Sequence, residues 1–155
     1  MEGNYAHAEG ERTVAKGIGS HVEGCQTVTE GDYAHAEGYD TRANGEASHA
    51  EGSITSAIGD CAHVGGFKTT AEGTNSFAHG KYLKANGEEQ FVIGKYNTID
   101  DNNTYAFIVG NGTTDSLRKN ALTLDWEGTL STNNLTANNL IANKVIIEHM
   151  KPTLT

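Results

Sequence analysis

Small and polar residues alternate along most of this chain, in short segments that recur every fourteen residues. In the first segment, "AHAE" at 6–9, alanines alternate with His7 and Glu9, and "TVAK" follows at 13–16. A period of two is typical of β-strands, because successive side chains point to opposite faces. The pattern therefore predicts two short strands in every fourteen residues.

The repeat has seven copies without a gap, from residue 3 to residue 100. Glycine occupies the first and the eighth position of every copy, and because glycine tolerates positive φ, these two columns predict two corners per coil. A short fixed period is the signature of a solenoid. We expect coils of strand, turn, strand and turn, stacked roughly 4.8 Å apart by parallel backbone pairing.

The alternation also assigns the faces of both strands. The small residues of the first strand are Ala6, Ala8, Ser20, Val22, Ala34, Ala36, Ser48, Ala50, Ala62 and Val64. Those of the second strand are Thr13, Ala15, Thr27, Thr29, Thr41, Ala43, Thr55, Ala57, Thr69 and Ala71. Two small faces that meet predict a thin interior, and the His and Glu side chains must then point outward.

The outward residues become apolar toward the C-terminal end of the repeats. One column reads His7, His21, His35, His49, His63, Phe77 and Phe91, and the other reads Glu9, Glu23, Glu37, Glu51, Gly65, His79 and Ile93. An eighth strand at 106–110 comes two residues later than the fourteen-residue period predicts, and it continues the columns with Phe107 and Val109. An apolar outward face predicts a contact surface, and a thin roll buries little by itself. We therefore expect closed, cyclic association.

The fourteen-residue repeat, with a Gly-terminated first strand and a T-x-A second strand, resembles the head repeats of YadA-like trimeric adhesins over residues 3–110. The resemblance implies an all-β, left-handed parallel β-roll, or β-solenoid, that forms a homotrimer. "SHAEG" and "AHAEG" carry His and Glu where the family pattern has Val and Ile, whereas "QFVIG" at 90–94 is closer to that pattern.

This His and Glu variant, followed by "RKNALTLDWEG" at 118–128, is similar to phage and prophage tail-fibre or appendage proteins. The similarity implies a virion protein assembled in the host cytoplasm, with other fibre or baseplate proteins and a host cell-surface glycan as partners. The alternative is the head of a bacterial trimeric surface adhesin. A complete adhesin of that kind would also carry a signal peptide, a long heptad stalk and a membrane domain, and we expect none of these here.

Three regions are expected along the chain: the roll at 1–110, a connector at 111–129 and a narrow fibre-like or trimerisation segment at 130–155. In the connector, "ALTLDW" predicts a strand with Leu122, Leu124 and Trp126 on one face. In the last region an apolar residue recurs every five positions. These residues are Leu130, Leu135, Leu140 and Val145.

Charge and composition narrow the classes of partner. The net charge of −9 disfavours nucleic acid and anionic membrane surfaces, which need clustered Lys and Arg. No run approaches membrane-spanning length, so no membrane insertion is expected. Cys25 and Cys61 fit no disulfide framework or metal-ligand spacing, and we interpret them as free thiols.

The His and Glu columns allow three hypotheses. In the first, they face a threefold axis and each imidazole meets a carboxylate of the neighbouring chain, which sets register and makes the N-terminal half sensitive to pH. In the second, His-x-Glu on one strand face binds a metal, although a ladder of near-identical sites is unusual.

In the third hypothesis the chain is an enzyme, which would need one singular constellation of residues. The hexapeptide pattern of trimeric acyltransferase helices is absent. We favour the first hypothesis and expect no catalytic residue, cofactor or metal. The interface residues expected on it are His7, Glu9, His21, Glu23, His35, Glu37, His49, Glu51, His63, Phe77, His79, Phe91, Ile93, Phe107 and Val109.

The turns after the first strand carry aromatic residues that could face a ligand. These are Tyr39, Phe67, Tyr82 and Tyr96. Aromatic rings beside Asp or Lys suit sugar stacking. The alternative, which we favour, is that they pack against the next turn or a neighbouring chain. An ice-binding threonine ladder is disfavoured, because the threonines are expected to point inward.

Overall fold

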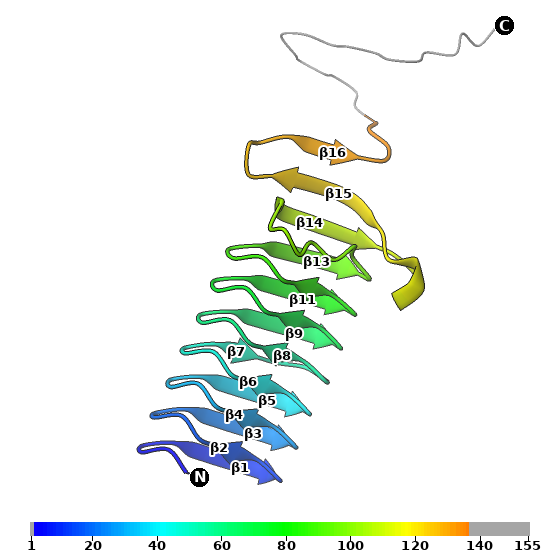
Figure 1. The fold of residues 1–155 in the computed structure, drawn as a ribbon. Helices are drawn as coiled ribbons and strands as arrows, with labels where there is room; N and C mark the ends of the chain where they lie inside the picture. The colour runs from blue at the N-terminus through cyan, green and yellow to red at the C-terminus, as the bar shows by residue number, and fades with distance from the viewer. Residues whose placement is uncertain (1, 137–155) are drawn as a thin grey trace, which may run out of the picture.

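The computed structural model describes residues 2–136, and they form a β-solenoid of about eight coils (Figure 1). The described residues are all-β except for one 3-10 turn, Asp115–Leu117. No helix among them is long and apolar enough to span a membrane. The all-β repeat architecture expected from the fourteen-residue period is thereby confirmed.

The larger sheet has ten strands in the order β1, β3, β5, β7, β9, β11, β13, β14, β15, β16. Its parallel strands are β1 (His7–Glu11), β3 (His21–Cys25), β5 (His35–Tyr39), β7 (His49–Ala50), β9 (His63–Phe67), β11 (Phe77–Lys81), β13 (Phe91–Lys95) and β14 (Tyr105–Asn111). Two antiparallel strands follow, β15 (Asn120–Asp125) and β16 (Leu130–Thr132).

The smaller sheet has six parallel strands of two residues each. They are β2 (Val14–Ala15), β4 (Val28–Thr29), β6 (Arg42–Ala43), β8 (Ser56–Ala57), β10 (Thr70–Ala71) and β12 (Lys84–Ala85). Each coil thus contributes one longer and one very short strand.

The strand register places equivalent repeat positions side by side. His21 pairs with His35 and Glu23 with Glu37, fourteen residues apart. Phe91 pairs with Phe107, sixteen residues apart, so the two extra residues before β14 are absorbed in the preceding turn. The predicted continuation of both columns into the eighth strand is confirmed.

Small side chains fill the space between the two sheets. Val22, Val64 and most alanines of the inner faces are buried, and Leu83 and Ile108 are the largest buried side chains described. Ala6 and Ala8 of the first coil are only partly buried. The buried threonines are Thr27, Thr29, Thr41, Thr55 and Thr69. Their inward position confirms the thin interior and removes the basis for an ice-binding ladder.

Buried hydroxyl groups in this interior find acceptors on the backbone. Ser20 Oγ donates to the carbonyl oxygen of Gly17 at 2.8 Å, and Ser48 Oγ donates to that of Gly45 at 2.7 Å. Because a buried hydroxyl without a partner is costly, these bonds allow polar residues to pack in so narrow a core.

The two glycine columns differ in backbone conformation, which corrects one expectation. Glycines at the eighth position do adopt positive φ, for example +107° at Gly24. Those at the first position do not. What both columns share is close approach to the next coil: a Cβ at Gly17 would overlap the carbonyl oxygen of Gly31, and one at Gly24 would overlap that of Gly38. The left-handed residue of the first-position corner lies two positions later, for example Tyr33 at φ 59°.

The connector extends the larger sheet and ends it. On β15, Thr123 is buried while Leu122 and Leu124 lie opposite Val109 and Phe107, which confirms that the two leucines share a face. Trp126 was expected on the same strand, but β15 ends at Asp125 because the chain turns there toward β16.

The ring of Trp126 is half-exposed, and its Nε1 donates to the carbonyl oxygen of Asn103 at 3.0 Å. In the last expected region, Leu130 begins β16 and Leu135 is exposed. The five-residue period expected through Leu140 and Val145 lies outside the described residues.

Candidate functional site

A continuous column of rings runs along the outward face of the larger sheet. We call it the ring column, and it consists of His7, His21, His35, His49, His63, Phe77, Phe91 and Phe107. Successive ring centroids lie between 4.4 and 5.6 Å apart. In-register parallel pairing imposes this spacing, since each ring stands directly beside its counterpart in the next coil.

The character of the ring column changes along the solenoid. The rings of His35 and His49 lie 4.8 Å apart and 7° from parallel, whereas those of Phe77 and Phe91 lie 4.4 Å apart and 8° from parallel. Phe91 is 40% exposed although its ring is apolar. The C-terminal part of this outward face is therefore an apolar surface that the described residues cover only partly.

This apolar surface is wider than the sequence reasoning predicted. Ile93 and Val109 lie beside one another on it, and Leu122 and Leu124 extend it onto β15. We call these residues, with the three phenylalanines, the apolar face. The leucines were assigned to one face of a strand, but only the antiparallel pairing with β14 places them next to Val109 and Phe107.

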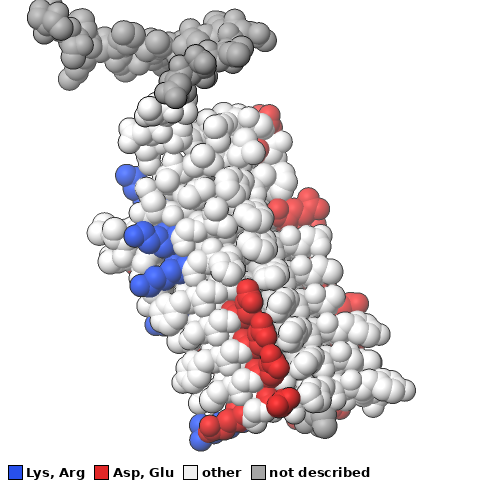
Figure 2. All heavy atoms as spheres, turned by 180° about the vertical axis from the view of Figure 1, so that it is seen from behind, with Lys and Arg blue, Asp and Glu red and all other residues white. Residues whose placement is uncertain are grey.

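Acidic side chains form a second column beside the histidines, and Figure 2 shows such a column on one face of the coils. Glu9, Glu23, Glu37 and Glu51, which we call the acid column, line a shallow groove together with Gly10, Gly24, Gly38 and Gly52. The glycines keep the groove open because they carry no side chain. In residues 2–136, no Lys or Arg forms an ion pair with these four carboxylates.

The acid column ends at a gap that brings two histidines to Glu51. Gly65 stands where the repeat places a glutamate, and a Cβ there would lie 2.6 Å from His79 Nδ1 and 2.9 Å from Glu51 Oε1. Glu51 Oε1 lies 3.7 Å from His79 Nδ1 and 3.8 Å from His63 Nε2. The missing side chain therefore lets the carboxylate approach both rings.

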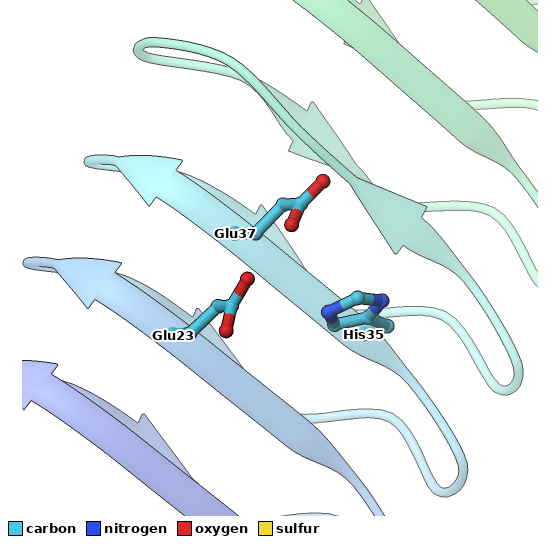
Figure 3. A group of neighbouring side chains, drawn as sticks. All are labelled: Glu23, His35 and Glu37. Carbon is cyan, nitrogen blue, oxygen red and sulfur yellow. The ribbon is translucent and has the colours of Figure 1, made fainter.

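Two clusters of one histidine and two glutamates lie between the ring column and the acid column. They are Glu23, His35 and Glu37, and then Glu37, His49 and Glu51, with ligand atoms all within 4.8 Å of one another in each cluster. In Figure 3, a ring nitrogen of His35 points toward the two carboxylates. Nε2 of His35 and Nε2 of His49 are buried and have no hydrogen-bond partner.

Three of the four aromatic turn residues form a separate cluster, in which Tyr82 stacks on Tyr96 and Phe67 meets Tyr82 edge-on. The ring centroid of Tyr82 lies 5.5 Å from that of Phe67 and 4.6 Å from that of Tyr96. Burial and the neighbouring Tyr82 raise the pKa of Tyr96. Tyr39 is 49% exposed and is not part of this cluster.

Cations lie near the three rings of this cluster. Lys68 Nζ lies 5.7 Å from the ring centroid of Phe67 and 5.2 Å from that of Tyr82. Arg118 lies over Tyr96 at 5.9 Å and also donates to the carbonyl oxygen of Tyr82 at 2.8 Å. Phe67, Tyr82 and Tyr96 thus stabilise the outer corner by packing on one another, whereas Tyr39 does not take part.

Neither the family models nor the curated proteins compared with this chain include a match.

Proposed function

We propose that this chain is a structural and adhesive module of a trimeric fibre, of the kind found in phage and prophage tail fibres or spikes. The observation that carries the proposal is the apolar face on a chain whose interior is thin. Phe91 stacks on Phe77 yet remains 40% exposed. A further copy of the chain is the simplest partner that could cover such a surface.

Threefold packing of a left-handed roll would gather the three apolar faces around one axis. Because the coils are in register, each Phe of one chain would meet its counterparts in the other two. Burial of an exposed Phe, Leu or Ile side chain contributes about 1.5–3 kcal/mol. The residues of the apolar face would then supply most of the adhesion between chains.

The N-terminal half of the same face would set register and partner choice. Its histidines and glutamates are half-buried from His21 to His63. Charge-assisted hydrogen bonds between chains are strong, but desolvation offsets much of the gain. We therefore assign to the apolar face the larger part of the association energy.

The adhesive role rests on display of the outer turns to a host-surface glycan. Tyr39 is the most exposed of the four turn aromatics.

In the alternative function, the same roll is the head of a bacterial trimeric surface adhesin. Neighbouring genes for tail or baseplate parts favour the fibre, and a signal peptide upstream of Met1 favours the adhesin.

Cysteine cross-linking tests the assembly directly. In a chain with Cys25→Ser and Cys61→Ser, which removes both free thiols, Phe77→Cys places a thiol on the apolar face. We expect mild oxidation to give covalent dimers within the trimer, because the cysteines meet near the axis. The matched control, Ser56→Cys, lies on the smaller sheet and should stay monomeric.

Equal cross-linking of the Phe77→Cys and Ser56→Cys chains would show that the disulfides form between chains that collide at random and not across a specific interface. Cross-linking of the Ser56→Cys chain alone would place the interface on the other sheet. Either result would contradict the proposal.

A further inference from the structure

We propose that the outward face of β3, β5 and β7 binds a divalent transition-metal ion between one imidazole and two carboxylates. The two clusters described above, Glu23 with His35 and Glu37, and Glu37 with His49 and Glu51, provide the ligands. All of these residues come from one chain. The site therefore needs no ligand from a partner chain, and a bound ion would take the place of the bonds that we propose between chains at these residues.

The strand geometry explains why each cluster forms. His35 and Glu37 are two residues apart on β5, so both point to the same face. Glu23 occupies the paired position to Glu37 on β3. Zinc bonds to His nitrogen and carboxylate oxygen are about 2.0–2.2 Å long, so ligand atoms on opposite sides of one ion lie about 4 Å apart. Small side-chain rotations would close the clusters around an ion.

An independent observation points to a missing ligand. Nε2 of His35 and Nε2 of His49 are buried without a hydrogen-bond partner, and these are the two histidines of the clusters. The neighbouring histidines differ. His7 Nδ1 lies 3.3 Å from His21 Nε2, and His63 approaches Glu51. Because buried polar atoms are almost always satisfied, a bound cation would account for both nitrogens.

The charge of the groove favours the same conclusion. The carboxylates of Glu23 and Glu37 stand side by side on paired strands, where like charges are destabilising. No Lys or Arg of the described residues neutralises them. A dication would remove this repulsion, and the open glycine side of the groove gives it access.

The ligand set selects the class of ion. Imidazole together with carboxylate suits Zn²⁺, Co²⁺ or Ni²⁺, whereas Ca²⁺ and Mg²⁺ prefer all-oxygen sites. Glu37 belongs to both clusters, so its carboxylate could bridge two ions. We expect one to two ions per chain, with water completing the coordination.

Calorimetric titration of the untagged full chain with ZnCl₂ at pH 7.5 tests the site, with MgCl₂ as the comparison ion. We expect saturable Zn²⁺ binding at one to two ions per chain and no matching Mg²⁺ isotherm. The double substitution His35→Gln and His49→Gln should weaken Zn²⁺ binding about ten-fold or more, since loss of even an outer-shell group costs that much. His7→Gln, an exposed histidine outside both clusters, is the control and should bind as the parent does.

Absence of Zn²⁺ binding, equal binding of Mg²⁺, or binding unchanged by the double substitution would each overturn the proposal. Circular dichroism of the double variant verifies that it remains folded. Light scattering of the same samples with EDTA separates the two proposals. A trimer that binds no Zn²⁺ would contradict the proposed metal site only. A monomer that binds Zn²⁺ would contradict the proposed trimer only.

Discussion

The rings of Phe77 and Phe91 lie 4.4 Å apart and 8° from parallel on the outward face of β11 and β13. In-register pairing of parallel strands places the two rings side by side and nearly parallel. Phe91 nevertheless remains 40% exposed, so the pair is only partly covered by its own coils.

Replacement of Phe91 by Asp should abolish association while the solenoid remains folded. Phe91 points away from the core, so the carboxylate would be solvated in a single chain but buried without a partner between chains. Light scattering measures the mass and circular dichroism the fold. Tyr5→Asp, at a side chain 94% exposed near the N-terminal end, is the control and should leave the mass unchanged. An unaltered mass for Phe91→Asp would contradict the proposed interface.

Gly59→Ala should destabilise the chain by about 2–3 kcal/mol, as overpacking against a fixed neighbour does. Its Cβ would overlap the carbonyl oxygen of Gly73 in the next coil, where the backbone is held by pairing on both sides. Gly128→Ala is the comparison, because φ there is +88° but no atom lies within 4 Å of the added Cβ. It should cost only about 1 kcal/mol of conformational strain. Equal losses in urea unfolding would contradict the proposed effect of close approach at Gly59.

Asp125 should control the turn between β15 and β16. Its carboxylate accepts hydrogen bonds from the backbone N–H of Thr129 at 2.7 Å and of Glu127 at 3.0 Å. The bond from Thr129 is the main cause that lowers the pKa of Asp125. The stabilisation is therefore present above the carboxyl's unfolded pKa and is lost as pH falls through the lower folded value.

Hydrogen exchange measures this effect at single amides. Asp125→Ala should reduce the protection factors of Glu127 and Thr129. Asp115→Ala, which breaks an ion pair with Arg118 instead, should not affect them. Unchanged protection of Thr129 in Asp125→Ala would show that the turn is held by its backbone bonds alone.

The repeating part of this fold could be predicted because one period fixes strand faces, register and corners together. His21 and His35 stand side by side since their fourteen-residue separation is one coil. The role of the first-position glycines could not be predicted in the same way. Close approach of Gly17 to Gly31 depends on how two coils pack in space, whereas a glycine in the sequence indicates only that the backbone there tolerates positive φ.

The alternation of residues along the strands predicts the outward columns, but it does not predict which side-chain atoms in them lack a hydrogen-bond partner. Which imidazole nitrogens remain without a partner depends on ring rotation and on side chains of neighbouring strands. The unpartnered Nε2 atoms of His35 and His49 therefore emerge only in three dimensions. The same holds for Leu122 and Leu124, whose place beside the Phe107 ring depends on antiparallel pairing after a turn.

The mass of the chain in solution, measured by size exclusion with light scattering at pH 7.5, tests the central claim most directly. A trimer through the apolar face predicts three times the 16.5 kDa chain mass. A mass of one chain would mean that the Phe77 and Phe91 stack faces solvent or another partner, and it would contradict the trimeric fibre.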